Sequence, residues 1–561
     1  MSIEDEKIIN EKIINEKIID EKKFPFSEIR PKQQNIINKI NNNPDKRYII
    51  IEAETGVGKS AVAVTACKDG NKGYIVTSTK QLQNQYMSDF YNQSITSVKG
   101  KNNYRCYFED RLTCNNGYCL INHKQSTECK KEHLCPYYNA RNRGLKSDIF
   151  LTSYKYFLKA TDNPNTFLPR GTVVFDECHL LESILVESFE ITLSLKDLDN
   201  KYNILDSAEL QDAVRLSNTS VLKDGYTKEN EEWINKIYNL LNYKKNIKFE
   251  EIKEQLGIVG DPETLTEEEM DLIIEENDDY VQIDRLCRQI KGFLVSKNIN
   301  EDWIIEPLED GLLLTPLNVQ YIFKNEIEKM AKDRIIFMSA TILDIKGFIK
   351  TFGLDEDDCL VIRCESDFDP DKSPIYTLQN CSTNYNALKD EKNLQKIKDE
   401  VEKILEKHKN EKGIIHTGNS TISKYLKDNI KGDRLLVRYD NIQNNDIINF
   451  HNSTKKPTVL VSSSLNEGVD LKNDLSRFQI IVKLPFLSLA DSRTKVKKDI
   501  DNNWYLAETF KKFVQQCGRS TRNSEDYSVT YVLDNKFAYW FGKAKKNKWF
   551  SKNFITRIRK E

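Results

Sequence analysis

The stretch Ala53-Glu54-Thr55-Gly56-Val57-Gly58-Lys59-Ser60 decides the fold of this 561-residue chain. It follows a β-rich run, Tyr48-Ile49-Ile50-Ile51, and precedes a helix-like run, Ala61-Val62-Ala63-Val64. A strand, a glycine loop and a helix in this order wrap backbone N–H groups, and the positive end of the helix, around phosphate oxygens. Ala53 stands where this pattern usually has its first glycine. The stretch therefore predicts a nucleoside triphosphate site.

The groups of the glycine loop have separate expected roles in binding ATP and Mg²⁺. The backbone of Thr55, Gly56 and Gly58 would surround the phosphates. Lys59 would reach the β- and γ-phosphates, and Ser60 would ligate Mg²⁺.

Gln33 lies in a helix-like segment that opens at Arg30, just before the glycine loop. Its amide both donates and accepts hydrogen bonds, so it could read the edge of an adenine. A residue on the surface of a helix would look the same in the sequence.

Composition sets limits on the class of protein. The length predicts more than one domain, and the chain has 84 basic and 86 acidic residues, so any contact with nucleic acid must come from local grooves. No apolar run approaches the length of a membrane span, and the N-terminus has no signal-peptide core. We expect a soluble intracellular protein that does not contact membranes, with residues 1–23, built on a five-residue repeat, as a low-complexity leader.

Five of the 12 cysteines fall between residues 106 and 135, namely Cys106, Cys114, Cys119, Cys129 and Cys135. Their spacing does not form the paired Cys-x-x-Cys knuckles that are typical of zinc sites. Four thiolates and a spare would suit an iron–sulfur cluster, whose last ligand is often followed by proline, as Cys135 is. Spacing alone leaves an iron–sulfur cluster and structural zinc equally open.

A second anchor is Gly171-Thr172-Val173-Val174-Phe175-Asp176-Glu177-Cys178-His179. An apolar strand that ends in two carboxylates would place Asp176 beside Mg²⁺ and Glu177 where it could activate water. His179 is suited to relay the state of hydrolysis to a neighbouring domain. Together with the glycine loop, this segment predicts a nucleotide hydrolysis site.

The chain then changes character. From about 183 to 300, apolar residues recur at helical spacing, and Glu263–Asp279 holds nine acidic residues and no basic one, which predicts a mainly helical insertion with a solvated acidic face. Nothing in this insertion suggests catalysis. Trp303 through Leu317 are expected to return the chain to the first core, which ends in the strand Arg334–Thr341.

A second α/β unit follows. A strand at Val459 runs into a segment that contains Glu467 and Asp470, two acids that could contact the nucleotide and Mg²⁺. Gln515, Arg519 and Arg522 form a motif in which the two arginines share one helical face. Across a domain cleft they would stabilise the transferring phosphoryl group as arginine fingers do.

Taken in this order, the motifs resemble superfamily 2 helicases, and specifically the XPD/DinG family of iron–sulfur DNA helicases. The resemblance runs from about Arg30 to Asp534. It is carried by Ala53–Ser60 (motif I), Thr77–Gln85 (motif Ia), Asp176–His179 (the D-E-x-H box), Ser339–Thr341 (motif III), Ser464–Asp470 (motif V), Gln515–Arg522 (motif VI), the flanks Lys99–Cys106 and Cys135–Tyr138 of the cysteine region, and Ile481–Phe486.

The resemblance implies an α/β fold of two RecA-like P-loop NTPase domains, residues 24–345 and 346–561. It implies an iron–sulfur insertion at 100–140 and a helical arch-like insertion at 182–304, both within the first domain. Two departures from the family's pattern are Ala53 and Cys178, and neither removes a group that the chemistry requires.

The resemblance also implies an activity: ATP-driven 5′→3′ translocation on single-stranded DNA and unwinding of forked duplexes, by a protein expected to be a monomer. Lys59, Asp176, Glu177, His179, Gln515, Arg519 and Arg522 would form the catalytic set. The family's cluster is usually [4Fe–4S], and its pattern favours Cys106, Cys119, Cys129 and Cys135 as ligands, with Cys114 spare. A translocase without strand separation, an RNA–DNA hybrid substrate and a non-enzymatic scaffold are the alternatives.

Overall fold

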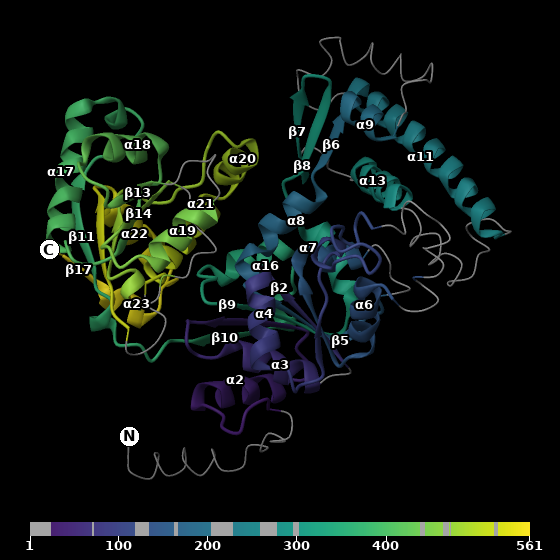
Figure 1. Ribbon diagram of the computed structural model, residues 1–561, viewed down its shortest axis with the longest axis horizontal. Coiled ribbons are helices and arrows are strands. Elements are labelled where there is room, and N and C mark those ends of the chain that lie inside the picture. The colour runs from purple at the N-terminus through teal and green to yellow at the C-terminus, as the bar shows by residue number, and fades with distance from the viewer. Residues whose placement is uncertain are drawn as a thin grey trace.

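The computed structural model describes residues 24–69, 72–117, 129, 134–161, 167–202, 228–258, 278–295, 302–437, 444–463, 471, 473–520 and 526–560. Two seven-stranded sheets organise these residues, and Figure 1 shows the two sheet-containing domains side by side. Helices α9 (Leu195–Tyr202), α11 (Lys228–Leu256) and α13 (Asp278–Leu294) stand out from one of them. The expected leader at 1–23 lies outside the described residues.

The first sheet is parallel throughout and has the strand order β10-β1-β9-β5-β2-β4-β3. Its strands read as short, nearly continuous apolar runs, as expected for a sheet buried on both faces. They are β1 (Tyr48–Ala53), β2 (Gly73–Thr77), β3 (Ile95–Ser97), β4 (Ile149–Ser153), β5 (Arg170–Asp176), β9 (Ala331–Ser339) and β10 (Cys359–Cys364).

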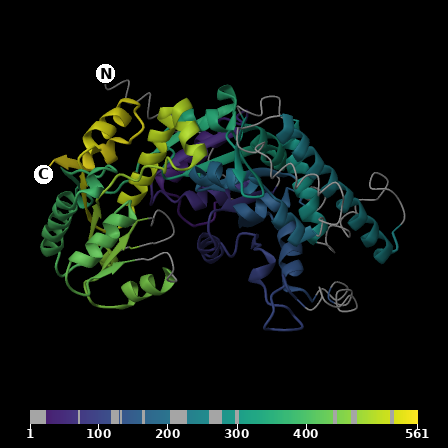
Figure 2. The ribbon, with the colours of Figure 1, turned by 90° about the horizontal axis from the view of Figure 1, so that it is seen from above.

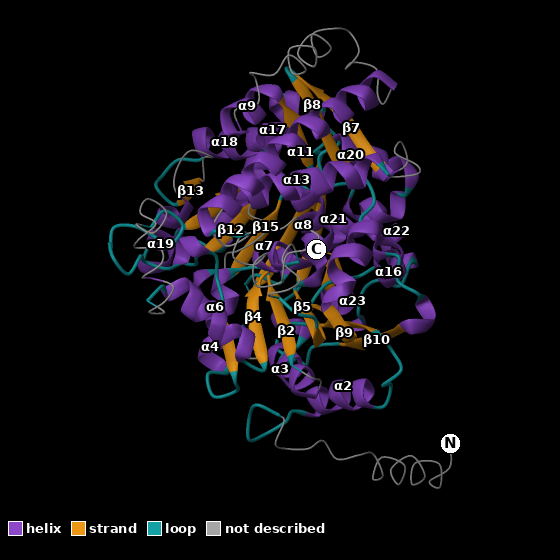
Figure 3. Ribbon diagram, turned by 90° about the vertical axis from the view of Figure 1, so that its right-hand side faces the viewer, coloured by secondary structure: helices purple, strands orange, loops and turns teal. Residues whose placement is uncertain are grey.

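Helices cover both faces of this sheet (Figure 3). Side chains of β1 alternate between the two cores, with Ile49 and Ile51 on one face and Tyr48 and Ile50 on the other. The helices are α2 (Pro31–Asn41), α3 (Lys59–Asp69), α4 (Lys80–Asp89), α6 (Pro136–Lys146), α7 (Tyr154–Ala160), α8 (Leu181–Phe189), α15 (Gln320–Ile322) and α16 (Ile345–Phe352).

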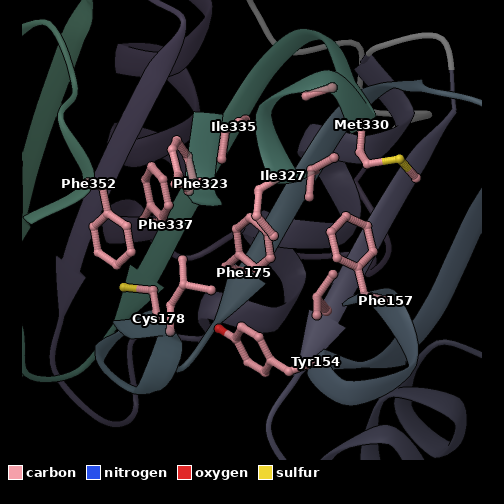
Figure 4. Close-up of a cluster of buried hydrophobic side chains, with 14 of the residues drawn as sticks. Tyr154, Phe157, Phe175, Cys178, Phe323, Ile327, Met330, Ile335, Phe337 and Phe352 are labelled. Carbon is pink, nitrogen blue, oxygen red and sulfur yellow. The ribbon is translucent and has the colours of Figure 1, made fainter. Parts of the chain in front are cut away.

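An aromatic cluster fixes β5 and β9, the two strands that carry the acidic motif and the following hydroxyl motif. The rings of Phe175 and Phe337 stack with centroids 5.9 Å apart, and Phe352 stacks on the other side of Phe337 at 6.0 Å. Tyr154 stacks on Phe175 from the side that faces away from Phe337, as Figure 4 shows. Close packing of this kind holds the ends of both strands in a set position.

The second sheet, also parallel, has the order β13-β14-β12-β15-β16-β11-β17. Its strands are β11 (Ile375–Cys381), β12 (Gly413–His416), β13 (Leu435–Val437), β14 (Val459–Ser462), β15 (Phe478–Ile481), β16 (Val529–Asp534) and β17 (Ile558–Lys560). Its helices are α17 (Glu391–Lys407), α18 (Ser420–Asn429), α19 (Asn444–Ser453), α20 (Ser492–Ile500), α21 (Asn502–Cys517), α22 (Phe537–Lys546) and α23 (Lys552–Arg557). Two such α/β units match the expected pair of RecA-like domains.

The chain leaves the first domain later than expected. Strand β10 pairs with β1 along its whole length, from Tyr48 opposite Cys359 to Ala53 opposite Cys364. The expected boundary at 345/346 therefore falls inside the first domain, because α16 and β10 complete the first sheet before the crossing.

The arch-like insertion is not purely helical. Helices α9 (Leu195–Tyr202), α11 (Lys228–Leu256) and α13 (Asp278–Leu294) enclose a separate core with an antiparallel sheet of order β6-β8-β7. Its strands are β6 (Ile191–Ser194), β7 (Trp303–Leu308) and β8 (Gly311–Pro316). The expected return of Trp303–Leu317 to the first core is wrong, because this hairpin buries Leu312 and Leu314 against the insertion's own helices. Most of the acidic run, 263–277, lies outside the described residues.

Candidate active site

A cleft of about 1180 Å³ lies between the two domains, at the carboxyl ends of the first sheet's strands. Parallel α/β sheets bind ligands at this end, where strand termini and helix N-termini converge. The first domain lines the cleft with the glycine loop and the acidic motif, and the second domain lines it with Gln515 and Arg519 from the end of α21. The sequence motifs therefore meet in one space.

The glycine loop joins β1 directly to α3. Gly56 and Gly58 have φ angles of 91° and 87°, which L-residues rarely adopt. A Cβ on Gly58 would also collide with the side chain of Gln33. Lys59 opens α3, and its Nζ donates to the backbone oxygen of Ala53, 2.9 Å away. Ala53 is fully buried at the end of β1, so its small side chain is tolerated below the loop.

Gln33 does not take the expected position for reading an adenine. Its Oε1 accepts from the backbone N–H of Arg30 at 3.0 Å, and its Nε2 donates to the Gly58 oxygen at 3.3 Å. It is buried, and it is not among the described residues that line the cleft. In this structure one end of the amide supports the glycine loop at Gly58, and the other end caps the start of α2 at Arg30.

Asp176 ends β5 and is 3 % exposed. Its Oδ2 accepts a hydrogen bond from the Tyr86 hydroxyl at 2.8 Å, and its Oδ1 accepts from the Glu177 N–H at 3.0 Å. Burial, followed by the charge of Glu177, raises the pKa of Asp176 to about 6, while Lys59 opposes the shift. A cation in front of this carboxylate would be strongly favoured.

Tyr86, which the sequence analysis did not select, is therefore part of the site. It lies on α4, is 1 % exposed, and has a pKa well above its usual value because of burial and then the charge of Asp176. A tyrosine in a polar helix carries no motif of its own. The signal in the sequence was its place one residue after the segment Thr77–Gln85.

Glu177 adopts a left-handed conformation, with φ 59° and ψ 47°. Backbone strain in a non-glycine residue is characteristic of functional sites. Here it places the Glu177 carboxylate 3.3 Å from His179 Nδ1, which in turn lies 2.8 Å from the Ser339 hydroxyl. The acidic motif and the end of β9 thus share one hydrogen-bonded group.

The second domain joins this group directly. Gln515 Nε2 donates to the Thr341 hydroxyl at 3.2 Å, and Thr341 follows Ser339 in the same turn. Arg519 is 6 % exposed and lines the cleft. The other expected residues of this domain, Glu467, Asp470 and Arg522, lie outside the described residues.

At its far end, beyond the acidic motif, the cleft is lined by Ser78, Thr79, Lys80 and Gln81 of the segment after β2. Thr79 caps α4, since its hydroxyl accepts from the Leu82 N–H at 3.2 Å. Hydroxyl, amide and ammonium groups at the start of a helix suit contact with phosphate.

The described cysteines of the region after β3 are buried, at 6–7 % exposure for Cys106, Cys114, Cys129 and Cys135. Cys114 Sγ lies 3.8 Å from Cys135 Sγ, and both share one hydrophobic cluster with Cys129 and Tyr137. Within the described part of the chain, no three or more His, Cys, Asp or Glu side chains are arranged to hold a metal. Cys119 lies outside it. Figure 2 shows the blue loop that carries the start of this region standing away from the body of the domain.

Two family models match the chain. The model described as DEAD_2 matches residues 65–198, and the Helicase C-terminal domain matches residues 395–554. In addition, no helix among the residues that the structure describes is long and apolar enough to cross a membrane.

Relatives and solved structures agree with these models. A probable ATP-dependent helicase of Methanocaldococcus jannaschii is 23 % identical and covers 95 % of each chain, and the ATP-dependent DNA helicase YoaA of Haemophilus influenzae is 23 % identical over 88 % of each. Among solved structures, an XPD helicase superposes with a TM-score of 0.57 at 16 % identity over 96 % of this chain and 100 % of its own, and an XPD apo structure with 0.54 at 17 % over 95 % and 100 %. The chain belongs to the XPD/DinG-like family of superfamily 2 ATP-dependent helicases.

Proposed function

We propose that this helicase acts on DNA, moving 5′→3′ along a single strand and separating the duplex ahead of it. The observation that carries the proposal is the single cleft in which Lys59, Asp176 and Glu177 of one domain face Gln515 and Arg519 of the other. A nucleotide bound there would contact both domains, so its hydrolysis would change how they close on each other.

Each described residue of the cleft has a chemical role in this proposal. Lys59 and the loop backbone bind the phosphates, and Arg519 stabilises charge on the transferring group. Ser60 and Asp176 would hold Mg²⁺, which would supply positive charge to the β- and γ-oxygens. Glu177 orients and deprotonates the attacking water.

The contacts of His179 with Glu177 and Ser339, and the hydrogen bond that Gln515 donates to the Thr341 hydroxyl, support a coupling between hydrolysis and domain closure. Each contact is between groups that a change at the γ-phosphate would disturb. In this proposal these residues hold one another in place, so that hydrolysis of the nucleotide in the first domain changes the contacts made by the second domain.

DNA is proposed as the substrate for two reasons. The relative YoaA is named a DNA helicase, and the far end of the cleft offers Ser78, Thr79 and Lys80 to a phosphate backbone. Such contacts do not distinguish DNA from RNA, and an RNA–DNA hybrid is therefore the competing substrate to be tested. The direction of movement is proposed from the family resemblance.

We also propose a [4Fe–4S] cluster in the cysteine region. Buried thiols beside aromatic rings fit such a cluster in donor chemistry and in their shielding from water. Cys106, Cys119, Cys129 and Cys135 would hold it, with Cys114 adjacent. The cluster would fix the fold of an insertion that contacts the fork; no step of hydrolysis involves it.

The test is ATP hydrolysis by anaerobically purified protein, with and without single-stranded DNA, followed by unwinding of forks with a 5′ or a 3′ tail. DNA-stimulated turnover with unwinding from the 5′ tail is expected, and Lys59→Ala should abolish both. Turnover without unwinding would favour a translocase, and stimulation by RNA–DNA hybrids alone would overturn DNA as the substrate. Absence of turnover under every condition would leave a non-enzymatic scaffold.

A further inference from the structure

The C-terminal segment of the chain forms part of the nucleotide cleft. Residues Trp549, Ser551 and Asn553, at the start of α23, line it together with Phe368 from the linker between the domains. The Ser551 hydroxyl donates to Glu54 Oε1 of the glycine loop at 2.6 Å. More than 490 residues separate these partners in sequence, and neither motif analysis nor composition connects them.

Topology shows which end of a nucleotide this wall would meet. Strand β1, which leads into the glycine loop, lies between β10 on one side and β9 on the other, and β5 with Asp176 lies beyond β9. The γ-phosphate and Mg²⁺ belong beside Asp176. The nucleoside must therefore extend from the loop toward β10 and the linker 365–368 that follows it.

Phe368 is placed to form an apolar face there. Its ring tip lies 2.7 Å from where a Cβ on Gly56 would be, so it packs directly on the loop. Trp549, Phe550 and Phe554 also line the cleft but are 5–9 % exposed, whereas Phe368 is only half-buried. Among these aromatic rings, that of Phe368 is the accessible one.

Asn553 supplies a polar group beside this ring. Its Nδ2 donates to the backbone oxygens of Phe368 at 3.0 Å and Ser366 at 3.3 Å. Two carbonyl acceptors identify which amide atom is the nitrogen, so the atom that Asn553 can offer to a ligand is the acceptor Oδ1. An acceptor can pair with the exocyclic amino group of adenine, but it opposes the O6 of guanine.

We propose that Phe368 and Asn553 form the nucleobase site of this helicase, with Phe368 as the stacking face and Asn553 as the group that favours adenine over guanine. The inference rests on the proposed ATP hydrolysis in this cleft. It gives the role first expected of Gln33, whose amide is bound to the backbone of Arg30 and Gly58, to the linker and the C-terminal segment. A nucleobase bound at this site would then contact both the linker that follows the first domain and the C-terminal segment of the second domain.

The test is steady-state hydrolysis of ATP and GTP by full-length protein with saturating single-stranded DNA. Phe368→Ala should raise KM for ATP about tenfold, because base–aromatic stacking is worth about 1–3 kcal/mol per base. Inhibition by inorganic tripolyphosphate, which has no base, should not change. Asn553→Ala should reduce the ATP:GTP ratio of kcat/KM about fivefold, a readout that general loosening of the linker would not shift.

Controls separate this inference from the proposed function. Phe368→Tyr keeps the aromatic face and should have the KM of the wild-type chain. Tyr539→Ala removes an exposed ring of α22 and should have no effect. In an active enzyme, an unchanged KM in Phe368→Ala together with an unchanged ATP:GTP ratio in Asn553→Ala would overturn the nucleobase site alone. A wild-type chain that hydrolyses neither nucleotide would overturn the proposed function itself.

Discussion

Glu182 of α8 and Arg493 of α20 form a salt bridge between the two domains, with 2.6 Å between Oε1 and Nη2. Lys497 also binds Glu182 Oε1, and Trp504 Nε1 donates to Oε2 at 3.1 Å. Arg493 further donates to the backbone oxygens of Pro316 and Leu317, beside the insertion's sheet. The Glu182 carboxylate therefore connects the second domain to α8, the helix that follows the acidic motif, and to the base of the insertion.

Replacing Glu182 with Gln should weaken the docking of the domains. Burial opposes the charge of Glu182, but Lys497 and Arg493 outweigh it and hold the pKa of the carboxyl well below its usual range. Both cations are about nine-tenths buried, at 11 % and 12 % side-chain exposure, and without the carboxylate they repel each other. Removing one partner of a buried pair costs about 3–5 kcal/mol.

We expect Glu182→Gln to lower the thermal midpoint and to increase cleavage of the domain linker by limited proteolysis. Glu402→Gln on α17 is the matched control, since it removes a partly exposed pair with Lys398 that is worth at most about 1 kcal/mol. Equal behaviour of the two variants would show that the Glu182 network does not hold the domains together.

Tyr86→Phe should weaken Mg²⁺ binding without disturbing the fold. The variant removes the hydroxyl that donates to Asp176 Oδ2, and loss of a partner of a metal-binding group costs about 10–100-fold in metal affinity. We expect the Mg²⁺ concentration that gives half-maximal ATP turnover to rise about tenfold, while turnover at saturating Mg²⁺ falls less.

Tyr154→Phe is the control for this variant. Its hydroxyl donates to the backbone oxygen of Asp176 at 3.1 Å, so its loss removes a buried hydrogen bond to the same residue but leaves the carboxylate bound. If both variants change Mg²⁺ dependence equally, the effect is structural and Tyr86 has no specific role.

Stability should fall as the pH is lowered through the range in which histidine titrates. His416 ends β12 in the second core, and burial, followed by the charge of Arg519, lowers its pKa from 6.5 to about 3. The unfolded chain binds a proton below about pH 6.5 and the folded chain does not, so stability is complete above 6.5 and declines toward 3. The loss is about 1.4 kcal/mol per pH unit.

Urea unfolding followed by tryptophan fluorescence at pH 7.5 and 5.5 measures this decline. His416→Gln removes the titrating group and should flatten the dependence by about 1.4 kcal/mol over that interval, whatever its effect at pH 7.5. An unchanged pH dependence in the variant would place the acid sensitivity elsewhere.

How far the structure can be predicted from the sequence depends on how many residues apart the interacting groups lie. The glycine loop and the acidic motif combine strand, turn and helix within ten residues, so their neighbours predict their structure. The salt bridge of Glu182 with Arg493 joins residues 311 apart, and the hydrogen bond that Ser551 donates to Glu54 joins residues 497 apart; no local pattern marks either contact. Gln33 shows the other limit, because its residue type fits a ligand and a backbone support equally well until burial decides.

The boundary between the domains and the place of the hairpin Trp303–Leu317 could not be predicted for a related reason. Strand β10 reads as an ordinary amphipathic strand, and only its pairing beside β1 assigns it to the first sheet. In the same way, the hairpin of β7 and β8 is apolar enough for either core, and the aromatic and aliphatic side chains of the insertion, such as Trp233, determine which one it joins.

Cysteine variants should separate the proposed cluster ligands from their neighbour. Cys135→Ser should lose iron and the absorbance near 400 nm, about the usual region for such clusters, because Cys135 precedes α6 and would anchor the cluster to the first domain. By the family resemblance, Cys119→Ser should lose iron as well, and Cys114→Ser should retain it. The measurement is iron and sulfide per chain after anaerobic purification, which does not depend on activity. Loss of iron in Cys114→Ser with retention in Cys119→Ser would instead make Cys114 the ligand, in keeping with its 3.8 Å approach to Cys135; zinc in place of iron throughout would overturn the cluster and keep the motor.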